Sequence, residues 1–525
     1  MKKIFFLYVL LGCMAVFGQE VITAEDLQED RFVISDNDRI RISEFLFDIT
    51  GQTQPYAITK NLDLTEQPEY YTPSEFEFYI KDLNQQLKNL RVMVDTDITV
   101  EYERTETGFI DARVTIHGRD TWNILVLPGP KYNSNTGISL KLKYKDENFL
   151  GSLEPFYVDF VFAQNKDLEE GISRPGIDVA TSVTYPFFWK NLNWDLDLSL
   201  DANLPFKKSE TYEFNVTTGL GTSIPLKDIL SFDFGTKFGM HRFDRDDDNN
   251  IYVGDEMYWN NQFYLNVPIT IYDFDYWGEL EYTPNVSINI NWDMDKIVNE
   301  DLKGPSLSFG HSVSFGRVDW LGNNRQGVST SLNNSFGYNF NTKKLTMNLS
   351  TSLKGYYAPL EWLGITAKAG WFYNFYKYDN TSFTGDVDSA GGDIRGILDY
   401  RVKTESALYF GFDLPVTVLH FDAEKIFNGN KFLSIFGFDL QLSPFFDFML
   451  THDPKTDRWY DFRDGWYGGG LQIIAHPHKW RSYQVRACVG FDLSEVFAQK
   501  RLYGVPAKRD GQRIYEMSLG FGLEY

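Results

Sequence analysis

Ile138-Ser139-Leu140-Lys141-Leu142-Lys143-Tyr144-Lys145 is the stretch that decides the fold. Apolar and polar side chains alternate along it without a break, and a period of two predicts a β-strand with one apolar face. The same alternation recurs at Phe156–Phe162, Trp194–Leu200 and Tyr212–Val216. Counted this way, the region after residue 121 contains roughly 16 to 18 strand segments of about ten residues each.

Two fold classes share this alternation, a soluble two-layer β-sandwich and a transmembrane β-barrel. The second face of the segments carries Lys, Asp, Asn, Ser and Thr throughout, and aromatic residues make up 17% of the chain. Aromatic girdles and a polar lumen are typical of barrels. The protein is therefore predicted to be mainly β, with a transmembrane antiparallel barrel of about 16 strands over residues 122–525. A net charge of -23 argues against a nucleic-acid partner.

The N-terminus predicts export. Lys2 and Lys3 precede an apolar run, so residues 1–18 are interpreted as a signal peptide that is too short to span a membrane. Cys13 loosely resembles a lipoprotein acylation site, which is the alternative interpretation. Residues 19–35 are acidic and are expected to be a flexible lead-in. Removal of residues 1–18 would leave Cys488 without a disulfide partner in the chain.

Residues 36–121 carry the pattern of a small α+β domain. Thr72-Pro73-Ser74-Glu75 has the form of a capping box with proline at the first helical position, and apolar residues follow at helical spacing. The expected elements are a strand over 40–49, helices over 57–64 and 73–90, and strands over 96–102 and 109–117.

The order βααββ, together with Phe47–Thr53, Leu62–Leu64 and Leu83–Leu90, resembles a POTRA domain. An unrelated small α+β domain is the alternative. A sheet of this kind offers an edge to which an extended chain can pair through main-chain hydrogen bonds.

With a barrel behind it, such a domain resembles the Omp85 superfamily. Asp146–Gly151 is similar to that family's Asn-aromatic-Leu-Gly turn, and Ile394–Ile397 to its Arg-Gly loop motif, with Ile397 in place of an aromatic residue. Phe445–Met449 is similar to a later strand motif, with Met449 in place of glycine, and Gly468–Leu471 to a glycine-rich strand.

The resemblance implies two sites. Arg395 and Gly396 would lie on a loop folded into the lumen, where Arg395 would meet Asp447 in a latch. The first barrel strand, beginning near Asn123, would meet the last strand, Ile514–Tyr525, in a weak lateral seam. The alternating residues of that last strand, which resemble an assembly signal, are Tyr515, Met517, Leu519, Phe521, Leu523 and Tyr525.

The resemblance further implies an outer-membrane assembly, insertion or translocation factor that is not an enzyme. Its partners would be unfolded outer-membrane or secreted clients, the lipid bilayer, and periplasmic chaperones or accessory lipoproteins, with the POTRA domain in the periplasm. A secretion pore for one exported partner and a simple diffusion porin are the alternatives.

No cofactor or metal is expected from the sequence. His476 and His478 form the one close histidine pair and lack a third ligand nearby in the sequence, so a turn is the preferred interpretation. The acidic loop 244–256 contains Asp244, Asp246 and Asp248 but lacks the glycine of a calcium loop, and a solvated loop is preferred there.

Overall fold

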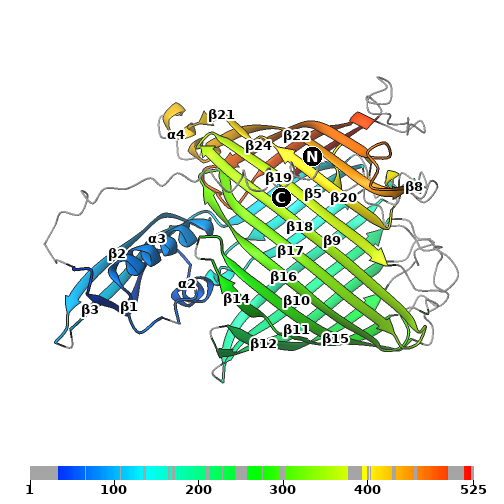
Figure 1. The fold of residues 1–525 in the computed structure, drawn as a ribbon. Coiled ribbons are helices and arrows are strands. Elements are labelled where there is room, and N and C mark those ends of the chain that lie inside the picture. The colour runs from blue at the N-terminus through cyan, green and yellow to red at the C-terminus, as the bar shows by residue number, and fades with distance from the viewer. Residues whose placement is uncertain are drawn as a thin grey trace, which may run out of the picture.

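The chain, described from a computed structural model, forms a small α/β unit followed by a closed β-barrel (Figure 1). The structure describes residues 34–521 apart from internal gaps, the longest of which are 243–256, 376–392 and 495–513. The predicted signal peptide, the acidic calcium-like loop, and Leu523 and Tyr525 lie outside the described residues. None of the helices in the described part of the chain combines the length and hydropathy that a membrane-crossing helix needs.

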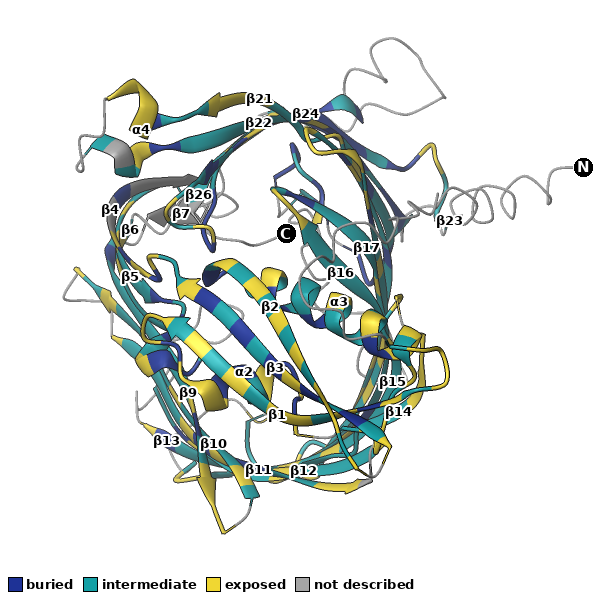
Figure 2. Cartoon of the chain, turned by 90° about the vertical axis from the view of Figure 1, so that its left-hand side faces the viewer, coloured by how far each residue is buried: buried dark blue, intermediate teal, exposed yellow. Residues whose placement is uncertain are grey.

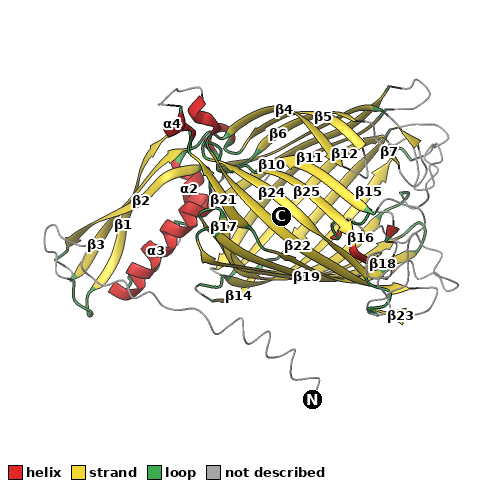
Figure 3. Cartoon of the chain, turned by 90° about the horizontal axis from the view of Figure 1, so that it is seen from above, coloured by secondary structure: helices red, strands yellow, loops and turns green. Residues whose placement is uncertain are grey.

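The small unit is a three-stranded sheet packed against two helices (Figure 3). The strand order is β1-β3-β2, with β1 and β3 parallel and β2 and β3 antiparallel. These elements confirm the expected order and the expected helices. Their bounds are β1 (Arg39–Thr50), α2 (Pro55–Asn61), α3 (Pro73–Asn89), β2 (Met93–Arg104) and β3 (Phe109–Asp120).

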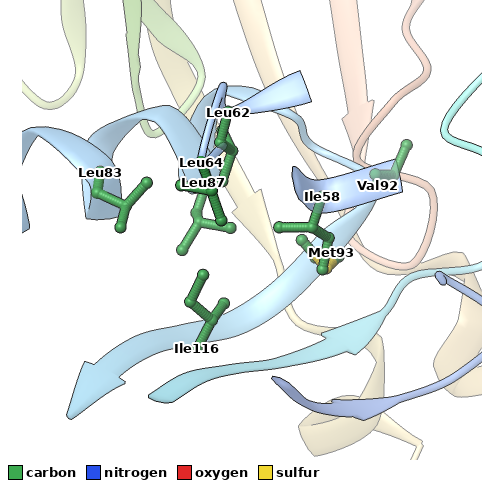
Figure 4. Packing of buried hydrophobic residues seen from close by; sticks show 8 residues of the cluster. All are labelled: Ile58, Leu62, Leu64, Leu83, Leu87, Val92, Met93 and Ile116. Atoms are coloured by element: carbon green, nitrogen blue, oxygen red, sulfur yellow. The ribbon is translucent and has the colours of Figure 1, made fainter. Parts of the chain in front are cut away.

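Helix α3 begins where the sequence predicts. The Thr72 hydroxyl accepts from the Glu75 N–H, and the Glu75 carboxylate accepts from the Thr72 N–H at 2.8 Å. That backbone bond holds the pKa of the Glu75 carboxyl below its usual range. The buried face of α3 supplies Leu83 and Leu87 to a core shared with α2 and the sheet, shown in Figure 4.

The barrel wall consists of antiparallel strands in chain order, and β26 closes it against β4. The first half contains β4 (Ile124–Asn133), β5 (Gly137–Asp146), β6 (Phe156–Ala163), β9 (Gly176–Trp189), β10 (Leu192–Pro205), β11 (Glu213–Lys227), β12 (Leu230–Arg242), β13 (Tyr258–Asn266), β14 (Ile269–Asp273) and β15 (Glu279–Trp292). The second half contains β16 (Ser306–Leu321), β17 (Asn324–Asn339), β18 (Lys344–Leu360), β19 (Leu363–Phe375), β20 (Ser406–Asp413), β21 (Val416–Phe421), β22 (Phe438–Asp453), β23 (Arg458–Trp459), β24 (Trp466–Pro477), β25 (Val485–Asp492) and β26 (Tyr515–Phe521).

Short elements lie in the connections between wall strands. They are β7 (Lys166–Asp167), β8 (Ile172–Ser173), α4 (Ala423–Ile426) and the 3-10 turns η1 (Phe149–Gly151) and η4 (Leu433–Phe436).

The predicted fold class is confirmed, and the number of described wall strands exceeds the expected 16 but lies within the 16 to 18 segments counted from the alternation. The described residues form 21 strand segments in the closed sheet. Strands β13 and β14 pair with the same neighbours and are two halves of one wall strand, as are β20 and β21, while β23 pairs with β22 alone. Counting each split strand once and leaving out β23 gives eighteen wall positions in the described chain. Breaks within a strand interrupt the period of two, so alternation alone does not give the number.

The two faces of the wall differ as the alternation predicts. On β5, Leu140 and Leu142 are exposed on the outside, whereas Lys141 forms an ion pair with Asp159 of β6 at 2.6 Å. The same outward apolar row runs along β15 at Val286, Ile288 and Ile290. An apolar outer band around a polar interior is the arrangement that a lipid-facing barrel requires.

The core of the small unit yields a stability test. Leu87 is fully buried, so Leu87→Ala leaves a cavity and is expected to destabilise this unit by about 2–5 kcal/mol. The measurement is the rate of limited proteolysis between residues 34 and 120 in the intact protein, with the exposed Lys88→Ala as the control. Equal rates for both variants would show that the core in Figure 4 does not hold the unit together.

Candidate functional site

Arg395 lies against the inner face of the wall, clamped between two carboxylates. Its Nε and Nη2 donate to the two oxygens of Asp447 at 2.7 and 2.6 Å, and Nη1 donates to Asp413 at 2.6 Å. Asp447 is 1% exposed, and the guanidinium also stacks over the Phe445 ring at 3.9 Å. Two hydrogen bonds between one guanidinium and one carboxylate fix the orientation of the Arg395 side chain in addition to pairing its charge. The contact expected between Arg395 and Asp447 is therefore present, and Asp413 is an addition to it.

Close backbone approach explains the glycines around Arg395. Gly396 has φ +95, and a Cβ there would meet the Phe491 backbone at 2.6 Å. A Cβ on Gly468 would collide with the Arg395 carbonyl, and one on Gly490 would meet Gly396 at 2.7 Å. The turn lies flat on β24 and β25 because these wall positions have no side chain.

The two departures from the family motif lie in the same cluster. Ile397 and Met449 are both fully buried in an apolar group with Ile394, Val402 and Ala407. A smaller residue at 397 and a larger one at 449 keep the shared volume filled, which is the exchange that close-packed interiors tolerate best. Both residues at the positions of departure are thus buried in this shared apolar cluster.

Two further contacts hold this loop to the last strands. Arg401 pairs with Asp492 of β25 at 2.8 Å, with side chains 2% and 0% exposed. The Gly396 N–H donates to the Glu516 carboxylate of β26 at 3.0 Å. The described residues of segment 393–402, which are 393–398, 401 and 402 and are called the inward loop below, are therefore bonded to the strand that closes the barrel.

The closure of the barrel is a short strand pair in the described part of the chain. Among the described residues, β26 pairs with β4 only at Ser518 with Asn133 and at Leu519 with Tyr132. Strands β16 and β17, by contrast, pair along their whole length. Of the predicted seam residues, Tyr515 and Met517 are exposed and lie on β26, and Phe521 is its last described residue.

The small unit lies across one mouth of the barrel (Figure 2). Arg91 donates to the Gly322 carbonyl at 3.0 Å and to the Arg481 carbonyl at 2.8 Å, and stacks over the Trp320 ring at 4.0 Å. Residues 319–323, called the docking hairpin below, are the end of β16 and the two-residue turn that joins it to β17.

Polar side chains of α3 complete the contact with the end of β16. Asp82 pairs with Arg317, and Asn89 donates to Asp319 at 2.9 Å while accepting from the Trp320 N–H at 2.9 Å. Helix α3 is therefore fixed by several directional bonds to the wall.

The turn Asp146–Gly151 is the second anchor. Asn148 donates to the Thr53 hydroxyl at 2.6 Å, and that hydroxyl donates to Asp120 at 2.6 Å. Gly151 accepts from the Gln54 N–H at 2.9 Å, and a Cβ on Gly151 would collide with the backbone of the small unit. A motif identified only by resemblance thus joins the two parts of the chain.

Sequence reasoning found Arg395, Gly396 and Asp447 but missed several of their partners. Asp413, Glu516 and the pair Arg401–Asp492 carry no motif, and only strand register brings them to the inward loop. The unusual density of glycines in β24 was the available signal for a close backbone approach.

The two histidines at 476 and 478 do not act together. Buried His476 contacts Gln441 through Nε2 at 3.0 Å, whereas His478 contacts Asp439 at 3.2 Å. Asp439 also contacts His420, so His478 belongs to a group with Asp439 and His420 that does not include His476.

No protein-family model matches the chain, and a search of curated proteins gives no match. Solved structures do match. A BamA from Haemophilus ducreyi that lacks POTRA domains 1-3 aligns with 92% of this chain and 84% of that chain, at 11% identity and a TM-score of 0.40. CdiB from Acinetobacter baumannii aligns with 93% and 74%, at 13% identity and a TM-score of 0.47. CdiB from Escherichia coli aligns with 93% and 77%, at 10% identity and a TM-score of 0.46.

These matches concern the overall fold alone. At these identities and TM-scores the likeness assigns no activity to the chain.

Removal of the Arg395 side chain is expected to destabilise the barrel strongly. Arg395→Ala leaves Asp447 buried without its cation, a loss of about 3–5 kcal/mol. The measurement is the midpoint of urea unfolding in detergent. The control is Arg463→Ala, because Arg463 pairs with Asp461 while 56% exposed. Adding Asp413→Asn and Asp447→Asn to Arg395→Ala is expected to recover part of the loss, and no recovery would contradict the charge argument.

Loss of the Arg91 side chain is expected to loosen the small unit from the barrel mouth. In a Cys488→Ser background, spin labels at Glu101→Cys and Lys190→Cys report the distance between the two parts. Arg91→Ala is expected to broaden the distance distribution because three contacts are lost together. Arg104→Ala is the control, since Arg104 pairs with Asp38 inside the small unit. Identical distributions for both variants would contradict docking through Arg91.

Proposed function

We propose that this protein is an Omp85-type outer-membrane factor that assembles or translocates other proteins without enzymatic chemistry. The observation that carries the proposal is the short pairing between β4 and β26. A wall with one weak pair can open sideways, and the exposed strand edges can then pair with a client strand.

The sequence of β4 weakens this pair further. Pro128 and Pro130 lie within the strand, and neither has an N–H to donate to a neighbour. Proline is confined to sheet edges or bulges for this reason. Strand β4 therefore has the composition of an edge, although its place in the closed wall is interior.

The inward loop is positioned to control the seam. The bond from the Gly396 N–H to Glu516 joins the seam strand to a loop that is itself fixed to the wall through Arg395 and Arg401. Release of β26 from β4 would leave that strand held by β25 on one side and by this loop from within.

The small unit supports a role in client delivery. Strands β1 and β2 each pair with β3 on one side only, apart from the single bridge between Ile40 and Tyr71, so both outer edges of the sheet are open. Docking through Arg91 and Asn148 places these edges at the barrel mouth. In the proposed orientation this mouth faces the periplasm, and clients and their chaperones arrive there.

A diffusion porin is a poorer explanation of the same features. A porin requires an open lumen, whereas here one mouth carries the small unit and the wall carries an inward loop with buried ion pairs. No nucleotide-binding motif is present in the sequence. The proposed driving force is therefore the folding of the client, through apolar burial in lipid and completed strand pairing.

Locking the seam is expected to abolish assembly activity. Ser518→Cys with Asn133→Cys, in a Cys488→Ser background, places a disulfide between facing residues of β26 and β4. The assay is the folding rate of an eight-stranded outer-membrane barrel, added from urea to liposomes that contain the protein. The oxidised variant is expected to fall to the rate of empty liposomes, and reduction is expected to restore activity.

The control is the pair Ser312→Cys and Asn333→Cys, which introduces the same residue types between β16 and β17. This crosslink is expected to leave the rate unchanged, because those strands are already fully paired. Full activity of the oxidised seam variant would exclude lateral opening and favour transport through the lumen.

A further inference from the structure

A group of two histidines and one aspartate lies at the barrel end that carries the small unit, near α4 in Figure 1. The Nδ1 of His420 is 2.5 Å from the Asp439 carboxylate, and the Nε2 of His478 is 3.2 Å from the same oxygen. The three potential ligand atoms lie within 4.8 Å of one another. We propose that His420, Asp439 and His478 form a binding site for a divalent transition-metal ion such as Zn²⁺.

The ligand types and their spacing fit such an ion. Zinc bonds histidine nitrogen and carboxylate oxygen at about 2.0–2.2 Å, so neighbouring ligands of a tetrahedral ion are about 3.3 Å apart. The His478 Nε2 and the Asp439 oxygen are 3.2 Å apart, which is close to this distance. The His420 ring is 64% exposed and stacks on the His478 ring with their centroids 4.9 Å apart, so metal binding would require this ring to move outward from Asp439. Three protein ligands leave at least one position for water or another ligand.

The surroundings are arranged around the carboxylate and one imidazole. Asn323 donates to the second oxygen of Asp439 at 2.7 Å, which orients the first oxygen toward the histidines. The Gly437 carbonyl accepts from the backbone N–H of His478 at 2.9 Å, and a Cβ on Gly437 would meet the His478 ring at 2.8 Å. The absence of a side chain at 437 makes room for this imidazole.

Strand register brings the three ligands together. His420 faces Asp439 across β21 and β22, and His478 directly follows β24, the next wall strand. A bound ion would join three neighbouring wall strands at their ends. Asn323 belongs to the docking hairpin, one residue after the Gly322 carbonyl that Arg91 bonds. The ion would therefore lie one hydrogen bond away from the contact that holds the small unit.

The alternative is a purely hydrogen-bonded group in which a proton is shared between His420 and Asp439. Metal binding would displace such a proton. A hydrogen-bonded group would show no saturable binding of a metal ion. The two interpretations differ in this directly measurable property.

The test is titration of the full mature protein, purified in detergent without a histidine tag and stripped with chelator, with Co²⁺ as the probe. About one Co²⁺ per chain is expected, with visible d–d absorption that Zn²⁺ abolishes. His420→Ala and His478→Ala are each expected to weaken binding at least about tenfold. Absence of binding by the wild type, or unchanged binding by both variants, would overturn the proposal.

Two further variants keep the test decisive. His117→Ala is the matched control, because His117 also contacts an aspartate, Asp48 at 3.0 Å, in a pair that joins no three-ligand group among the described residues. It is expected to bind as the wild type does. Asn323→Ala retains all three ligands and is expected to weaken binding about 10–100-fold. If a histidine variant fails to migrate as a folded barrel, Asn323→Ala decides the outcome, and wild-type affinity there would count against the site.

Discussion

The structure depends on one constraint, which is that every backbone N–H and C=O in a barrel wall must find a partner on a neighbouring strand. Most of the wall meets it with long antiparallel pairs, such as β16 with β17 and β17 with β18. The closure between β4 and β26 meets it over only two residue pairs in the described chain. Among the described residues, this closure meets the constraint over a shorter length than the long pairs do, which is the feature on which the proposed lateral opening rests.

The inward loop supplies rigidity near that place. Two charges of the loop, on Arg395 and Arg401, are buried against carboxylates of β22 and β25. Buried ion pairs contribute little net stability, because desolvation offsets their attraction, but they discriminate strongly against arrangements that leave one charge alone. The two ion pairs therefore disfavour positions of the loop in which either arginine is separated from its carboxylate. The hydrogen bond from the Gly396 N–H to Glu516 joins the last strand to this loop.

The small unit and the barrel are joined by directional polar contacts. Arg91 of the small unit bonds to the docking hairpin, and Asn148 of a barrel turn bonds to Thr53 of the small unit, so the unit is held at two places on the rim. Polar contacts of this type are typical of interfaces whose parts move relative to one another. The proposed metal site lies beside one of the two anchors, through Asn323. The proposed metal site and the contact that holds the small unit thus lie side by side at one rim of the barrel.

The sequence by itself determined the fold class and most of the local structure. A period of two predicts a wall strand wherever it runs unbroken, and a capping box predicts the start of α3, because both signals depend on neighbouring residues alone. Arg395 and Asp447 could be paired through resemblance to a known motif. The number of wall strands could not be obtained in this way, since β13 with β14 and β20 with β21 are each interrupted within one strand.

Only the tertiary structure decided which residues complete the sites. Asp413 and Glu516 reach Arg395 and Gly396, and His420 reaches Asp439 and His478, through strand register and chain closure over tens of residues. Register is a collective property of all the pairs in a sheet, so no local pattern encodes it. The exchange of volume between Ile397 and Met449 became visible for the same reason, since two departures from a motif can compensate only when they are known to touch.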